Sequence, residues 1–326
     1  MTDYWKLKNV FITGCTGFLG YWLTDYLLKE GATITGLVRD SVPQSSFFRS
    51  KLNERVSVVR GEVENFLLLE RIINEYEVDT VFHLAAQPIV GAANRSSLAT
   101  FETNVKGTWN ILEACRRNHP LVKRVIVASS DKAYGIQEDL PYTEGAPLKG
   151  SHPYDVSKTC TDLIASSFFS TYQLPVAITR CGNFYGGGDL NFNRLVCGTI
   201  RSVAHNKPVV IRSDGTPKRD YIYIKDAVSA YSTLAEKLEE YKLYGEAFNF
   251  SGGNPMGVLD MTRAILELMG KKDHPVEILN QASGEIKDQY LSIEKAQKVL
   301  QWTPHHSLED GLRETIDWYL SFFGLQ

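Results

Sequence analysis

Short apolar runs alternate with helical patterns through the first half of the chain, and this alternation limits the folds open to it. Runs rich in β-branched residues predict strands over 9–13, 33–38, 80–84, 122–128 and 176–179. Apolar residues at helical spacing predict helices over 18–30, 66–76, 98–117 and 153–172. Strands that alternate with helices pair in parallel, with the helices on both faces of the sheet. The sequence therefore predicts a doubly wound α/β fold.

Composition and charge exclude several classes of protein. The 326 residues carry a net charge of −3, and no cluster of Lys and Arg indicates a nucleic-acid or membrane surface. The five cysteines include no CxxC pair, and the His, Cys and Asp residues lack the spacing of a metal site. No run approaches the roughly 18 to 20 apolar residues of a spanning helix, and MTDYWKLKNVFITG lacks the pattern of a signal peptide. We expect a soluble, cytoplasmic protein with no metal and no nucleic-acid or membrane partner.

Glycines mark the point where the first strand gives way to the first helix, in GCTGFLG. Glycines at such a turn let backbone amides and the positive end of the helix approach a pyrophosphate. The predicted cofactor contacts here are Gly14, Thr16, Gly17, Phe18, Leu19 and Gly20. The GxxGxxG spacing resembles that of the extended short-chain dehydrogenase/reductase family. This resemblance implies a Rossmann-type fold and a tightly bound NAD or NADP that is regenerated in each turnover.

The end of the second strand, ITGLVRDS, bears on the choice of cofactor. Val38 stands where NAD-preferring members of this family usually carry Asp, and Arg39 and Asp40 follow it. An arginine there pairs with a 2′-phosphate, whereas Asp40 would reach the ribose hydroxyls. The sequence leaves NAD and NADP open.

Further matches to the family follow in order along the chain. The resemblance implies cofactor contacts from Glu62 and Val63 beside the adenine, from Leu84, Ala85, Ala86 and Gln87 along the dinucleotide, and from the helix-borne Asn104.

Tyr154 and Lys158, in YDVSK, lie four residues apart and share one face of a predicted helix. A lysine ammonium and an oxidised nicotinamide both favour the phenolate form of a tyrosine, so Tyr154 would take a hydroxyl proton near neutral pH. The resemblance also implies that Tyr154 and Lys158 contact the cofactor. Ser130 lies at the end of an earlier strand and would hydrogen-bond the same sugar hydroxyl. These three residues are the predicted oxidation machinery.

The C-terminal half resembles the nucleotide-sugar epimerase/dehydratase branch of the family. Asn183 in TRCGNFYG matches an asparagine that contacts the substrate diphosphate, and Arg219 in KRDYIYIKD matches an arginine that clamps phosphate. Gln87 and Ser130 complete the predicted substrate contacts. We expect a dinucleotide-binding Rossmann domain over 1–180 and a smaller α/β nucleotide-sugar-binding lobe over 181–326, with some segments returning to the first domain. The resemblance also implies a homodimer formed through helices 98–117 and 153–172.

Asp131 and Lys132, in SSDKAYG, add an acid and a base next to Ser130. A 4-epimerase needs only the Ser, Tyr and Lys set. A 4,6-dehydratase must also protonate the departing C6 hydroxyl and remove the C5 proton, which becomes acidic once C4 is a ketone. Asp131 would protonate the hydroxyl, and Lys132, with its pKa lowered by burial, would remove or relay the C5 proton. The Asp-Lys pair resembles CDP-glucose 4,6-dehydratases, and also UDP-GlcNAc dehydratases that invert C5; together with HLAAQP it fits the CDP-glucose group best.

Three functions follow from these residues. The first is an NAD(P)-dependent nucleotide-sugar 4,6-dehydratase, a lyase of carbohydrate biosynthesis that acts on a CDP-glucose-like substrate. The second is a UDP-sugar 4-epimerase, in which Asp131 and Lys132 only contact the substrate. The third is a non-catalytic dinucleotide-binding sensor, against which the intact set of Ser130, Tyr154 and Lys158 argues.

Overall fold

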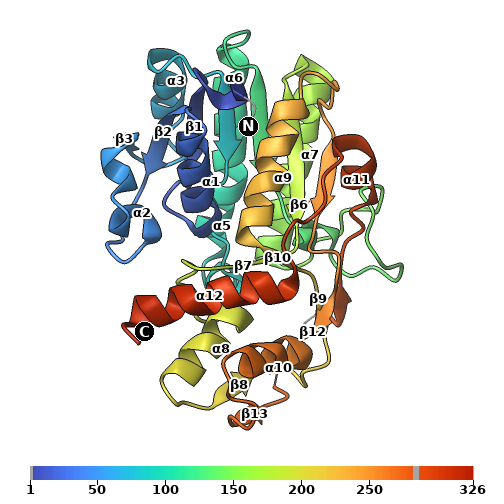
Figure 1. The fold of residues 1–326 in the computed structure, drawn as a ribbon. Helices are drawn as coiled ribbons and strands as arrows, with labels where there is room; N and C mark the ends of the chain where they lie inside the picture. The colour runs from blue at the N-terminus through green and yellow to red at the C-terminus, as the bar shows by residue number, and fades with distance from the viewer. Residues whose placement is uncertain (1–2, 282–285, 326) are drawn as a thin grey trace.

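A parallel sheet of seven strands forms the centre of the protein (Figure 1). The computed structural model describes residues 3–281 and 286–325. The strand order is β11 (Ala247–Phe250), β6 (Val176–Cys181), β5 (Arg124–Ala128), β4 (Thr80–His83), β1 (Asn9–Thr13), β2 (Thr33–Val38) and β3 (Ser57–Arg60). Every pair of neighbours in it is parallel. The predicted doubly wound α/β fold is confirmed.

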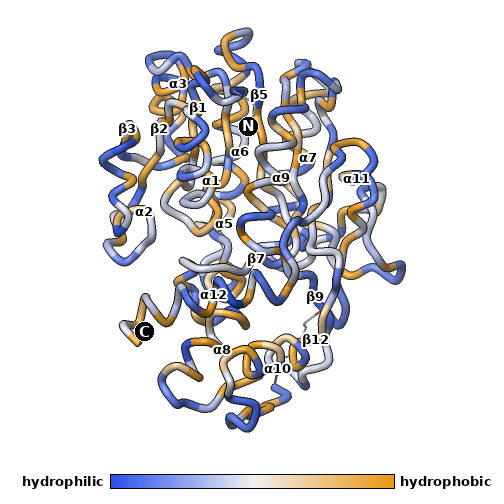
Figure 2. The backbone as a smooth tube through the Cα atoms, in the orientation of Figure 1, coloured by the Kyte–Doolittle hydropathy of each residue, from blue (hydrophilic) through white to orange (hydrophobic). Residues whose placement is uncertain are grey.

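Helices cover both faces of this sheet. One face carries α1 (Phe18–Lys29) and α9 (Ile224–Lys237), and the other carries α3 (Phe66–Glu75), α6 (Gly107–Arg117) and α7 (Pro153–Tyr172). Alternation along β1 serves both layers, because Val10 and Ile12 belong to the core under α1 and Phe11 to the core under α3 and α6. Figure 2 shows hydrophobic residues concentrated along the strands and the inward faces of these helices.

The predicted helix over 98–117 consists of three pieces. It begins as α5 (Ser97–Phe101), passes through a π-helical turn, η3 (Glu102–Lys106), and continues as α6. The carbonyl of Asn104 accepts hydrogen bonds from the hydroxyls of Thr108, at 2.5 Å, and Thr161, at 3.1 Å. These side-chain donors satisfy a carbonyl in the turn where the α-helical pattern is interrupted, which the apolar spacing of the sequence does not reveal.

Residues beyond 180 form a smaller lobe and also return to the first sheet. The lobe contains the strand pairs β7 (Asn183–Tyr185) with β10 (Tyr221–Tyr223) and β8 (Val209–Ile211) with β13 (Val276–Ile278), the sheet of β12 (Met256–Gly257), β9 (Lys218–Arg219) and β14 (Asp288–Gln289), and the helices α8 (Leu195–Ala204), α10 (Val258–Leu268) and α12 (Leu308–Phe323). The remaining short elements are η1 (Asp3–Trp5), α2 (Ser46–Arg49), η2 (Leu52–Glu54), α4 (Val90–Arg95), η4 (Asp131–Tyr134) and α11 (Glu294–Leu300). In contrast, β11 joins the central sheet as the partner of β6, and α9 packs on one face of that sheet.

The sheet reverses its winding between β1 and β4, which is where doubly wound sheets bind ligands beyond the carboxyl ends of their strands. In Figure 1, α12, α8 and α10 lie beyond this edge. No helix within residues 3–281 and 286–325 combines the length and the apolar character needed to span a bilayer.

Candidate active site

The glycine turn after β1 packs directly against the chain that leaves β4. Gly14 has a φ of +77°, and a Cβ there would lie 2.8 Å from the Ala85 nitrogen and 2.9 Å from the Leu84 carbonyl carbon. A Cβ on Gly20 would collide with the Gly14 carbonyl oxygen. Gly17 caps the N-terminus of α1, a helix of 12 residues. The turn therefore holds a positive helix end open to a bound anion, as a pyrophosphate requires.

A buried network fixes this turn to the sheet. The hydroxyl of Thr13 accepts hydrogen bonds from the backbone nitrogens of Leu84 and Ala85, each at 3.2 Å, and lies 2.9 Å from Nδ1 of His83. The other ring nitrogen of His83 lies 3.2 Å from the Thr108 hydroxyl. Burial lowers the pKa of His83 to about 3, so the ring is neutral, and it links Thr13 to Thr108 through its two nitrogens. Nothing in the sequence marked His83 for this part.

A cavity of about 710 Å³ extends from the glycine turn to the end of β5. The predicted cofactor residues that line it are Gly14, Thr16, Gly17, Phe18, Leu19, Gly20, Arg39, Asp40, Glu62, Val63, Leu84, Ala85, Ala86, Tyr154 and Lys158. Ser130, Asp131, Lys132 and Asn183 line its far end. Segments that are distant in sequence thus meet around one elongated space, and the residues present fit a dinucleotide.

Gln87 and Asn104, also predicted to contact the cofactor, are not among the lining residues of this cavity. The buried Asn104 amide instead accepts from the Gln87 backbone nitrogen at 2.7 Å and donates to the Ser157 hydroxyl at 2.9 Å. The Gln87 side chain accepts from the Ile89 nitrogen at 3.2 Å. The Asn104 amide and the Gln87 side-chain oxygen are therefore engaged within the protein rather than turned into the cavity.

At the other end of the cavity, Arg39 and Asp40 pair with each other. The Arg39 Nε lies 2.7 Å from an Asp40 carboxylate oxygen, and both side chains are exposed. Arg60, at the end of β3, donates to the Ser41 hydroxyl at 2.8 Å. Both a cation and an anion thus stand where the adenosine ribose of a dinucleotide would lie.

Ser130, Tyr154 and Lys158 meet beyond the ends of β5 and β6. Burial raises the pKa of Tyr154 to about 12, and the nearby Ser130 hydroxyl offsets only part of that rise. The Lys158 ammonium donates to the Ala128 carbonyl at 2.7 Å, and burial lowers its pKa to about 8. In the protein alone the phenol is therefore protonated near neutral pH. The expected phenolate depends on added positive charge, such as an oxidised nicotinamide brings.

Asp131 and Lys132 do not form a solvated surface pair. The Asp131 side chain is 4% exposed, and one of its oxygens accepts from the Ser130 hydroxyl at 2.9 Å. Lys132 Nζ lies 3.5 Å from the other oxygen, and its side chain is 20% exposed. The acid and the base therefore adjoin Ser130 from inside the cavity.

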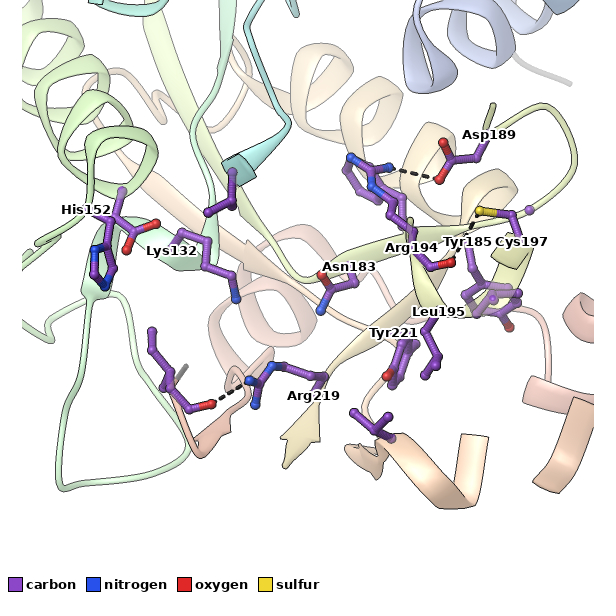
Figure 3. A pocket seen from close by; sticks show the side chains of 17 residues that line it. Lys132, His152, Asn183, Tyr185, Asp189, Arg194, Leu195, Cys197, Arg219 and Tyr221 are labelled. Carbon is purple, nitrogen blue, oxygen red and sulfur yellow. Dashed lines mark hydrogen bonds and ion pairs between the residues drawn. The ribbon is translucent and has the colours of Figure 1, made fainter. Parts of the chain in front are cut away.

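A second cavity, of about 360 Å³, opens from the first at Lys132, Asn183 and Arg194 (Figure 3). The Asn183 side chain donates to the Asp220 carbonyl at 3.1 Å. The Arg219 guanidinium lines this cavity and donates to the carbonyls of Lys218, Lys287 and Ile286. The predicted substrate residues Asn183 and Arg219 thus share a space that is continuous with the acid–base pair.

Sequence reasoning missed three charged residues of this second cavity, Arg194, Asp189 and Asp155. Arg194 lines both cavities, and its Nη1 lies 3.1 Å from an Asp189 carboxylate oxygen. Its positive charge lowers the pKa of Tyr154, against the larger effect of burial. Asp155, the neighbour of Tyr154, lines the second cavity near Lys132, and burial raises its pKa. No motif in the sequence indicates Arg194, whereas Asp155 lies inside YDVSK beside the predicted Tyr154. Among the described residues, no group of three or more His, Cys, Asp or Glu side chains is placed to hold a metal ion.

Comparisons with known proteins agree with this architecture. The family described as GDP-mannose 4,6 dehydratase matches residues 11–315. A CDP-glucose 4,6-dehydratase of Salmonella typhimurium is 31% identical over 97% of this chain and 92% of its own length. A UDP-glucuronate 4-epimerase of Thermodesulfobacterium geofontis is 30% identical, over 94% of both chains.

A solved structure shares the fold over nearly the whole chain. It is a dTDP-glucose 4,6-dehydratase from Bacillus anthracis in complex with NAD, with a TM-score of 0.85 and 28% identity, covering 96% of this chain and 97% of that one. The matched relatives are nucleotide-sugar dehydratases and epimerases of the extended short-chain dehydrogenase/reductase type. This chain therefore belongs to the GDP-mannose 4,6-dehydratase family.

Proposed function

We propose that this protein is a nucleotide-sugar 4,6-dehydratase that converts a CDP-glucose-like substrate into a 4-keto-6-deoxy sugar and water. The observation that carries this proposal is the buried Asp131 carboxylate, hydrogen-bonded to Ser130 and adjoined by Lys132. Epimerisation at C4 has no use for an acid and a base beside the oxidation machinery. Water loss requires both.

The glycine turn, Arg39 and Asp40, and the segment Leu84–Ala86 would hold a nicotinamide dinucleotide along the larger cavity. When bound, such a cofactor would supply an acceptor for the hydride from C4 of the sugar and a donor of the hydride to C6. The Bacillus anthracis relative contains NAD. Chromatography of the nucleotide released from the purified protein distinguishes NAD from NADP.

Ser130 and Tyr154 would hold the C4 hydroxyl and take its proton. The Ser130 hydroxyl donates to the Asp131 carboxylate at 2.9 Å, and it is near enough to Tyr154 to lower the pKa of that phenol. A proton that Tyr154 accepts from the C4 oxygen therefore has a direct path, through Ser130, to the Asp131 carboxylate. This path restores Tyr154 and leaves Asp131 protonated for the next step.

Asp131 and Lys132 then divide the protons of water loss. Lys132 accepts the C5 proton as the C5–H and C6–O bonds break, and Asp131 gives its proton to the C6 oxygen, which leaves as water. Lys132 returns a proton to C5 when C6 is reduced, so each group ends the cycle as it began. Asn183, Arg219 and Arg194 would bind the diphosphate, for which guanidinium groups offer paired donors.

The second candidate is a UDP-sugar 4-epimerase. It has support from the 30% identical UDP-glucuronate 4-epimerase, an identity close to that of the dehydratase relative. In that case Asp131 and Lys132 would only contact the sugar. A dinucleotide-binding sensor is disfavoured because Ser130, Tyr154 and Lys158 all line the larger cavity, and a protein that only binds cofactor does not need this set.

Incubation with CDP-, dTDP-, GDP- and UDP-glucose, followed by NMR, separates these functions. We expect a 4-keto-6-deoxy product from the CDP-sugar. A product inverted at C4 that still carries its C6 hydroxyl would establish the epimerase, and cofactor binding without turnover would favour the sensor. Tyr154→Phe should abolish C4 oxidation, whereas Lys132→Ala should retain it and block water loss.

We also propose that the protein is a homodimer joined through α6 and α7. The helices present Trp109, 44% exposed, and Leu163, 58% exposed, although both are large apolar residues. Replacing both by Glu should convert a dimer into a monomer in light scattering. Leu67→Glu, on the exposed side of α3, is the matched control and should leave the mass unchanged. A wild-type monomer would refute this arrangement.

A further inference from the structure

Strand β14 reaches from the smaller lobe to the acid–base pair. It pairs in parallel with β9, so that Asp288 lies opposite Lys218 and Gln289 opposite Arg219. The Asp288 carboxylate accepts from the Lys218 backbone nitrogen at 3.0 Å. The strand is therefore anchored to the same β9 that carries Arg219.

Gln289 uses both ends of its amide at the acid–base pair. Its side chain is fully buried. Its Nε2 donates to the Asp131 carbonyl at 2.9 Å, and its Oε1 accepts from Lys132 Nζ. The two contacts fix the orientation of the amide, because the reverse orientation would turn a donor toward the lysine ammonium and an acceptor toward a carbonyl.

This contact determines where the Lys132 amine points. The lysine stem is flexible, and Lys132 Nζ lies at 3.5 Å, the limit of hydrogen bonding, from its other described partner, Asp131. Gln289 accepts a hydrogen bond from the amine and is joined at the same time to the backbone of Asp131. The amide is neutral, so it orients the amine without the strong preference for ammonium that a carboxylate would impose.

We propose that Gln289 is a positioning residue that aims Lys132 at C5 and so governs water loss but not C4 oxidation. This inference rests on the dehydratase function proposed above. Proton transfer requires the base to lie within hydrogen-bond reach of the proton, and a misplacement of about 1 Å costs on the order of a hundredfold in rate. In the described hydrogen bonds Gln289 contacts none of Ser130, Tyr154 and Lys158, and it reaches Asp131 only at the backbone carbonyl, so we expect C4 oxidation to depend on it little.

The test compares the two half-reactions in Gln289→Leu holoenzyme. Formation of reduced nicotinamide after mixing with CDP-glucose reports C4 oxidation, and NMR of the 4-keto-6-deoxy sugar reports water loss. We expect water loss to slow by roughly ten- to a hundredfold, with the rate of C4 oxidation and the KM within about twofold of the wild type. Equal loss of both half-reactions, or unchanged water loss, would overturn the proposal.

A second variant, Gln289→Glu, keeps the acceptor for Lys132 and adds a charge. It favours the ammonium form of Lys132, so the pH at which water loss is half-maximal should move upward while that of C4 oxidation stays in place. Asp131, Asp155 and Asp220 also act on Lys132 or its surroundings and are unchanged in this variant. A merely structural role for Gln289 predicts no such shift, so an unmoved profile counts against the proposal.

Asp288→Ala is the matched control because it loosens β14 without touching Lys132. Water loss in this variant should fall less than in Gln289→Leu, because the Gln289 amide is retained; a loss as large as that of Gln289→Leu would show that the strand rather than the amide matters, and would refute the role of Gln289. If the wild-type enzyme inverts C4 and loses no water, the dehydratase function itself is wrong, and this inference fails with it. The wild-type product alone reveals that case.

Discussion

Lys158 belongs to the predicted oxidation machinery, and its burial lowers the stability of the folded protein. Its side chain is buried, its ammonium donates to the Ala128 carbonyl, and burial lowers its pKa from 10.5 to about 8. The unfolded chain thus holds the proton more tightly than the folded protein. Below pH 8 this difference destabilises the fold by about 3 kcal/mol, since one pKa unit corresponds to about 1.4 kcal/mol. The penalty declines as pH rises from about 8 toward 10.5, because the unfolded chain then loses its proton as well.

Lys158→Met removes the charge and keeps most of the volume. The loss of the hydrogen bond to Ala128 costs about 1 kcal/mol, so the variant should be more stable than the wild type by about 2 kcal/mol at pH 7. Near pH 10 the gain should vanish. The same variant should lose C4 oxidation, because the ammonium near Tyr154 is gone.

Urea unfolding, followed by tryptophan fluorescence at pH 7 and pH 10, measures this effect. The protein should first be freed of dinucleotide, so that lost cofactor binding does not contribute to the difference. Lys271→Met, at an exposed position, is the control and should stay within about 0.5 kcal/mol of the wild type at both pH values. A variant at position 158 that is less stable than the wild type at pH 7, or a gain that does not depend on pH, would refute the reasoning.

Two further predictions concern the cofactor turn and the buried ion pair of α7. Gly14→Ala should weaken dinucleotide binding at least tenfold in a fluorescence titration, because its φ of +77° and the Ala85 nitrogen 2.8 Å from the added Cβ force the turn to move; wild-type affinity would contradict the fit. Asp162→Ala leaves the Arg180 guanidinium buried without the carboxylate that it contacts at 2.7 and 2.8 Å, and should lower the free energy of unfolding by about 3–5 kcal/mol. A change below about 1 kcal/mol in urea unfolding would show that Arg180 finds another partner.

The pattern of apolar residues in the sequence predicted those strands of the central sheet that are buried on both faces. The strands β1 and β2 and the helix α7 have the bounds that the sequence predicted, because continuous apolar runs bounded by turn residues leave few alternatives. Strand β3 escaped prediction, since it lies at the edge of the sheet and only Val59 in it is buried. Likewise, β11 has no partner nearby in sequence and joins β6 only through the tertiary fold.

The same division holds for the candidate site. Gly14, Tyr154 and Lys158 lie in motifs whose spacing carries the geometry, so sequence alone indicated them. Gln289 is separated by 157 residues from the lysine it contacts, and a single glutamine in KDQY forms no pattern. Arg194 enters the site because a loop and the start of α8 fold against β7, which no local signal encodes.

The return of α9 and β11 to the central sheet bears on how this protein can be recombined. β11 covers the edge of β6, and α9 packs beside α1 on the same face. A chimera that joins residues 1–180 of one relative to the remainder of another would place its seam inside the central hydrogen-bonded ladder. Exchange of sugar specificity therefore calls for transplanting the loops and short strands between β6 and α9, and those after β11, while α9 and β11 stay with their native sheet. Segments that are proposed to bind the nucleotide sugar thus alternate along the chain with segments that build the core.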